Sequence, residues 1–130
     1  MVEQAACAAA LHCTADEVRA QRLRGSDFLL RGCGQAWDAI LEVAGEGGGT
    51  PSVLAVAARL SPAALPELQR WVGDWWTYCH PAGLRAHAAL IRRASARRRR
   101  LAELSREAAR VGRGDPAALG TGGVSIDFAE

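Results

Sequence analysis

Apolar residues recur in this chain mainly at the three- and four-residue spacing of helices. The clearest segment runs from Phe28 to Val43, where Trp37 and Leu41 fall on one predicted helical face. The chain is also rich in Ala and Arg and poor in aromatic residues, which favours helix over strand. The sequence therefore predicts an all-α fold, a single compact domain of about six helices that ends in a long Arg-rich helix.

Capping signals place the boundaries of the first three helices. The first is predicted from about Val2 to Leu11. Thr14 and Glu17 have the spacing of a capping box at the start of a second helix, which runs to about Arg24. Ser26 or Asp27 then caps the third helix, and the glycines within 31–34 predict a break in its early turns.

Three Pro residues place the later boundaries. Thr50-Pro51 and Ser61-Pro62 each join an N-cap residue to Pro at the first helical position, so two helices are expected to start there. His80-Pro81 precedes the long helix, predicted over 82–111 with one apolar stripe interrupted around Arg97 and Arg98. The domain is thus expected to cover 1–111, with 112–130 as a flexible C-terminal tail.

All 16 basic residues are Arg, and the formal net charge is +2. A P-loop motor needs a Lys on the nucleotide phosphates, so this chain cannot be such a motor. The glycine-rich segment 45–49 lacks both that Lys and a preceding strand, and we expect it to be a surface loop. No nucleophile elbow, metal-binding helix or paired carboxylates stand at an informative spacing, so we expect no catalysis and no cofactor.

Four cysteines, Cys7, Cys13, Cys33 and Cys79, form no Cys-x-x-Cys pair and are expected to be reduced and packed as small apolar side chains. The alternative is a zinc site made by His12-Cys13 and Cys79-His80, although adjacent ligands on a helix rarely point at one metal. The apolar runs are shorter than the roughly 20 residues that span a bilayer, and we expect a cytoplasmic protein with no membrane partner.

Three segments share one register with a known family. They are Val2-Glu3-Gln4-Ala5, which opens a small-residue helix, then Leu23-Arg24-Gly25-Ser26-Asp27-Phe28, and Ala36-Trp37-Asp38-Ala39-Ile40-Leu41. Together they resemble the N-terminal domain of the DnaB-type bacterial replicative helicase. The likeness continues through Ala55-Val56-Ala57-Ala58-Arg59-Leu60 and His80-Pro81-Ala82-Gly83 and covers roughly Val2 to Val111.

Two departures limit what this resemblance implies. The connection between Leu60 and Trp71 is short and carries Ser61-Pro62 in place of the family's Val-Gly-Gly turn, and the second hairpin helix and the motor domain are missing. The resemblance implies an assembly and partner-docking module in DNA replication. Its partners would be a second copy in a dimer, a helicase, a primase or a loader. The sequence leaves open whether the chain is whole or a fragment of a longer helicase.

Two groups of side chains are the candidate contact sites. The first is basic and allows three interpretations: contact with nucleic-acid phosphates, a solvated helix face balanced by Glu103 and Glu107, or docking of a protein partner. The second is aromatic and suits either a protein interface or core packing. The residues are Arg92, Arg93, Arg97, Arg98, Arg99 and Arg100, together with Trp75 and Trp76. A small helical regulator that binds nucleic acid through the Arg-rich helix is the alternative function.

Overall fold

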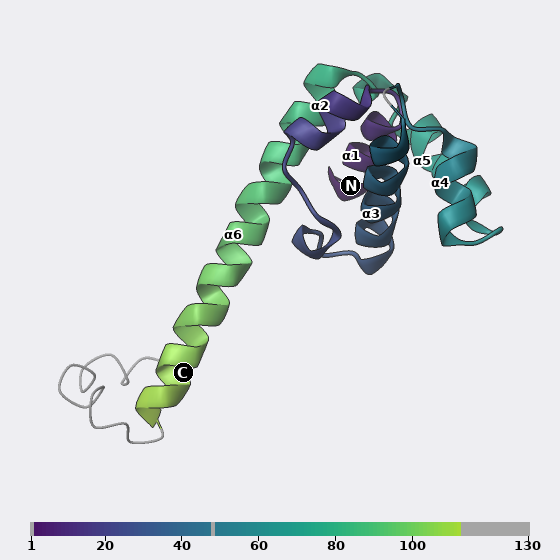
Figure 1. Ribbon diagram of the computed structural model, residues 1–130. Helices are drawn as coiled ribbons and strands as arrows, with labels where there is room; N and C mark the ends of the chain where they lie inside the picture. The colour runs from purple at the N-terminus through teal and green to yellow at the C-terminus, as the bar shows by residue number, and fades with distance from the viewer. Residues whose placement is uncertain (1, 48, 113–130) are drawn as a thin grey trace. The chain divides into compact units, whose positions relative to one another are not determined.

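The computed structural model describes residues 2–47 and 49–112. Across these residues it contains six α-helices and two short 3-10 turns and no strand, which confirms the all-helical fold class. The helices are α1 (Val2–Ala10), α2 (Ala15–Ala20), α3 (Arg31–Glu46), α4 (Val53–Leu60), α5 (Ala64–Asp74) and α6 (Pro81–Gly112), and the turns are η1 (Gly25–Asp27) and η2 (Trp76–Tyr78) (Figure 1). The predicted tail lies outside the described residues, apart from Gly112.

The chain divides into two units, Met1–Ser95 and Ala96–Glu130. The boundary falls inside α6, so the first turns of this helix belong to the first unit and residues 96–112 to the second. No helix in the described residues is both long and apolar enough to cross a membrane.

Helix α1 forms the centre of the first unit. All residues from Ala5 to Ala10 are completely buried, and α1 packs against α3 and α5 (Figure 1). Five of these six residues are Ala, whose small side chains allow neighbouring helices to approach closely. The alanine-rich opening of the chain is therefore a core helix.

The start of α3 is stabilised by a side chain from α1. The carboxylate of Glu3 accepts hydrogen bonds from the backbone N–H groups of Leu29 and Leu30, at 2.7 and 2.8 Å. Leu30 is the N-cap residue and has no capping side chain of its own, so a residue far away in the sequence satisfies these donors. The charged acceptor also lies near the positive end of the α3 dipole.

The prediction that α3 starts after Ser26 or Asp27 is wrong. Asp27 instead accepts a hydrogen bond from the backbone N–H of Arg24 at 2.9 Å and another from the hydroxyl of Ser95 at 2.7 Å. These bonds hold residues 25–27 as the separate turn η1. Helix α3 begins at Arg31, within the segment 31–34 where the sequence predicts a break in the helix. Leu29, an apolar residue within the helical segment predicted from Phe28 to Val43, is 69% exposed.

The capping box of α2 is confirmed: Thr14 and Glu17 each accept from the other's backbone N–H. The helix ends at Ala20, earlier than predicted, and Arg22 has a positive φ of 55°. The guanidinium of Arg92 donates to the carbonyl oxygen of Gln21 at 2.5 Å. This bond holds the end of α2 against α6 within the first unit.

Helices α4 and α5 start later than their Pro residues predict. The N-cap of α4 is Ser52, whose hydroxyl accepts from the N–H of Ala55 at 3.4 Å, and the N-cap of α5 is Ala63. Helix α6 begins as predicted after His80, and the Nδ1 atom of His80 accepts from the N–H of Gly83 at 3.0 Å. An imidazole thus takes the usual place of a hydroxyl or carboxylate cap.

The apolar residues of α6 form two faces, not the single stripe predicted. Leu84, Ala88 and Ile91 are buried in the first unit, whereas Leu90 is 46% exposed. In the second unit Leu101 and Leu104 are exposed, and they lie on one face of the helix because three residues make nearly one turn. Only the first of the two faces therefore belongs to the core.

Candidate partner-docking surfaces

An aromatic surface lies where α5 ends. Trp75 caps α5 and starts the turn η2, which turns the next side chains outward. Trp76 is 63% exposed and Tyr78 is 42% exposed. We use the name aromatic surface for these two residues and the two histidines that touch them, His12 and His87.

The two histidines come from distant parts of the chain. The His12 ring, just after α1, meets the Trp76 ring edge to face, with 5.2 Å between centroids. The His87 ring on α6 meets Tyr78 in the same way at 4.8 Å. Neither histidine was predicted as a contact residue, because no local pattern in the sequence brings residues 12 and 87 to η2.

The other two tryptophans of this region face inward. Trp71 is buried, and Trp75 is partly buried against the core. The indole N–H groups of both are buried and have no hydrogen-bond partner among the described residues. Trp76 is therefore the predicted Trp contact residue that the structure places outward, while Trp75 contributes mainly to packing.

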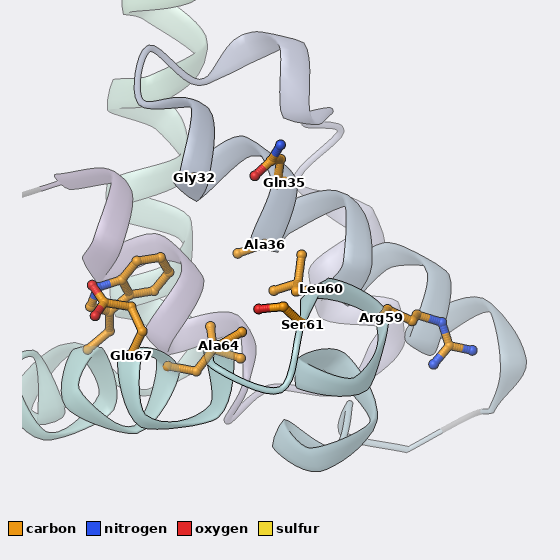
Figure 2. Close-up of a pocket in the computed structure, with 10 residues that line it drawn as sticks. Gly32, Gln35, Ala36, Arg59, Leu60, Ser61, Ala64 and Glu67 are labelled. Atoms are coloured by element: carbon orange, nitrogen blue, oxygen red, sulfur yellow. The ribbon is translucent and has the colours of Figure 1, made fainter.

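A groove of about 510 Å³ opens between α3, α4 and α5. Its walls are Gly32, Gln35 and Ala36 of α3, residues 59–61 at the end of α4, and Ala64, Glu67, Leu68 and Trp71 of α5 (Figure 2). Two ion pairs flank it: Arg59 with Glu46, and Arg70 with Glu67 at 2.6 Å. This groove could not be predicted from local sequence patterns, because it depends on how three helices pack.

Two of the predicted arginines belong to the first unit. Arg92 is engaged with the Gln21 carbonyl, so its guanidinium has a structural partner. The Nε of Arg93 lies 3.5 Å from the carbonyl oxygen of Ala89, at the outer limit for a hydrogen bond, and the residue is exposed. The predicted contact role of these residues stays a prediction.

The four consecutive arginines open the helix of the second unit. Arg97, Arg99 and Arg100 are exposed and Arg98 is half-buried. Because successive residues point about 100° apart, the run surrounds the helix instead of forming one basic face. The following turns add Glu103 and Glu107, and Glu107 pairs with Arg110.

The same helix carries an apolar stripe. Leu101 and Leu104 are 59% and 55% exposed, Ala108 is exposed, and Val111 is half-buried. These residues share one face, and we call them the leucine stripe. Within the second unit, as far as it is described, this is the apolar surface available to a partner.

The cysteines lie apart from these surfaces. Burial raises the pKa of Cys13 to about 11, assisted by the nearby Glu17 carboxylate and Cys79 thiol. A hydrogen bond to Cys33 and complete burial raise the pKa of Cys7, and the same bond lowers that of Cys33. In the described residues no three His, Cys, Asp or Glu side chains gather as a metal site.

The chain matches no protein-family model, no curated protein and no solved structure. The resemblance to the helicase N-terminal domain therefore stays a prediction from the sequence. The exposed leucine stripe and the aromatic surface stand on geometry, independently of that similarity.

Proposed function

We propose that this protein is a non-catalytic assembly and partner-docking module related to the N-terminal domain of the DnaB-type replicative helicase. It acts in DNA replication by associating with itself and by contacting a helicase, a primase or a loader. The resemblance along residues 2–111 supports the cellular context, and the exposed surfaces support the mode of action.

The leucine stripe is the observation that carries this proposal. Leu101 and Leu104 are adjacent on one face and each exposes more than half of its surface. Burying a Leu side chain completely is worth about 1.5–3 kcal/mol, so covering both would stabilise a complex appreciably. A helix that holds two leucines in water one turn apart is suited to a partner helix.

The aromatic surface supports a second contact. Trp76 and Tyr78 combine large apolar area with polar atoms at their edges, the combination enriched at energetically important interface positions. The aromatic surface belongs to the first unit and the leucine stripe to the second. The protein can therefore use the leucine stripe for assembly and the aromatic surface for a different partner.

The oligomeric state tests the proposal directly. Light scattering across micromolar concentrations should give a mass that rises from monomer to dimer. Mixing with a DnaB-type helicase should then shift the helicase in sedimentation, and Trp76→Ala should weaken that shift while leaving the dimer intact. A strictly monomeric mass together with no helicase binding would overturn the proposed function.

Nucleic-acid binding is the second candidate, favoured by the exposure of Arg97, Arg99 and Arg100. Arg binds phosphate bidentately and keeps its charge at all relevant pH values. Glu103 and Glu107 follow within two turns and would oppose phosphates along the same helix. For this reason we place protein docking first.

A further inference from the structure

We propose that the second copy binds through the leucine stripe as an antiparallel helix, with Leu101 of each chain packed against Leu104 of the other. This inference rests on the proposed function, because it names the partner and the geometry of the assembly step. It concerns residues 96–112 alone, which form helix throughout.

The stripe has the spacing of a coiled coil. Arg97, Leu101, Leu104, Ala108 and Val111 are separated by four, three, four and three residues. This alternation keeps one face of a helix toward a partner helix and defines the a and d positions of a heptad, with Leu101 at a and Leu104 at d. The exposure of both leucines leaves this face open to a partner.

Arg97 decides the direction of pairing. In a parallel pair each core position meets its own copy, so two Arg97 side chains would meet in the apolar interface and repel. In the antiparallel pair centred between Leu101 and Leu104, Arg97 faces Ala108 of the other chain. The small Ala leaves room for the Arg stem, and the guanidinium can reach solvent. Size and charge therefore both favour the antiparallel direction.

The flanking charges decide the register. Arg100 and Glu107 occupy the g positions, which face each other across an antiparallel pair. The proposed register brings Arg100 of each chain next to Glu107 of the other, twice by symmetry. A shift of one heptad in either direction would instead place Arg100 beside Arg100 or Glu107 beside Glu107. Glu107 already pairs with Arg110 of its own helix, but both side chains are at least half exposed, so that pair is weak and does not prevent the new one.

A charge-swap cycle tests the register. Arg100→Glu and Glu107→Arg should each raise the dimer dissociation constant by about three- to tenfold, since each change replaces two attractive contacts with two contacts between like charges. The double variant should return to within about twofold of wild type. Arg106→Glu, Glu103→Arg and their double variant serve as matched controls, because positions f and c point away from the interface, and all three should leave the constant unchanged.

An apolar variant tests the surface itself. Leu101→Ser with Leu104→Ser should abolish the dimer in sedimentation velocity, whereas Leu54→Ser, at a Leu 67% exposed in the first unit, should not. Circular dichroism of each variant checks that the helices remain. The antiparallel arrangement would be overturned by a dimer that survives the double Ser change, or by a charge swap that fails to restore pairing. In either case the protein still self-associates, so the proposed function stands. A monomeric wild-type chain would remove the inference and leave helicase binding as the remaining test of the proposed function.

Discussion

The indole N–H of Trp37 donates a hydrogen bond to the backbone carbonyl oxygen of Leu23, with 3.0 Å between nitrogen and oxygen. The Trp37 ring is completely buried, and its centroid lies 5.5 Å from that of Phe28. Leu23 and Phe28 both belong to the segment between α2 and α3. One side chain of α3 therefore contacts two points of the segment 21–30, whose only regular structure is the turn η1.

Replacing Trp37 should accordingly destabilise the protein strongly. Trp37→Ala should lower the free energy of unfolding by about 3–5 kcal/mol through the lost packing and the cavity left behind. Trp37→Phe should lower the free energy of unfolding by less. It still leaves the Leu23 carbonyl without its hydrogen bond, which should destabilise the protein by about 1–3 kcal/mol. Urea unfolding measures both, and Trp76→Ala, at an exposed ring, is the control expected to change little. Near-native stability for Trp37→Ala would contradict the assigned core.

The Glu3 contact with the start of α3 predicts a stability effect at an outwardly ordinary surface residue. Glu3→Ala should lower the free energy of unfolding by about 1–3 kcal/mol, because two backbone donors lose a charged acceptor. Glu3→Gln keeps one oxygen and should fall between Ala and wild type. Glu42→Gln, at an exposed carboxylate later in α3, is the matched control. Thermal melts in which all three variants behave alike would exclude a capping role for Glu3.

Two glycines of α3 should respond in opposite directions to the same change. A Cβ at Gly34 would lie 2.5 Å from the backbone oxygen of Gly25. Relieving this clash would require the backbone of one of the two segments to move. Gly34→Ala should therefore destabilise. A Cβ at Gly32 meets nothing within 4 Å, so Gly32→Ala should stabilise the helix by roughly 0.5–1 kcal/mol. Equal midpoints for the two variants in denaturant unfolding would refute the close approach of 25 and 34.

The raised pKa of Cys13 predicts a loss of stability at alkaline pH. Below the ordinary thiol pKa of 9.0 the Cys13 thiol holds its proton in both the folded and the unfolded chain, and its contribution to stability is fully present. Between pH 9 and about 11 the unfolded thiol ionises first, so stability falls, by on the order of 3 kcal/mol from this group. Cys13→Ala should flatten the slope of unfolding free energy against pH in that window. An unchanged slope would show that Cys13 ionises equally in both states.

The arginine run separates the two candidate functions. If it docks a protein, replacing Arg98, Arg99 and Arg100 by Gln should leave DNA affinity weak and unchanged while impairing self-association or helicase binding. If it contacts phosphates, the same change should lower DNA affinity and reduce the slope of log K against log salt by about 0.9 per lost contact on duplex DNA. Fluorescence anisotropy at several salt concentrations distinguishes them. Submicromolar, steeply salt-dependent binding that the Gln variant abolishes would favour the nucleic-acid regulator.

The helical class, the number of helices and the place of Trp37 on an apolar helix face could all be predicted from the sequence alone. These follow from local rules: apolar spacing selects the helix, and short-range caps such as Thr14 with Glu17 mark its start. The expectation that the chain is not a P-loop motor rests on the absence of Lys from the sequence and stays a prediction.

Three features could not be predicted from the sequence: the residue where α3 begins, the face of α6 that is buried, and the side chains that form the aromatic surface. The start of α3 depends on Glu3, and the aromatic surface on His12 and His87, which all come from other segments of the chain. On α6, the periodicity marks apolar positions without saying which neighbour covers them. Leu84 is buried by the packing of the first unit, whereas Leu101 is exposed. Such outcomes arise from contacts between residues distant in sequence, which local spacing does not encode.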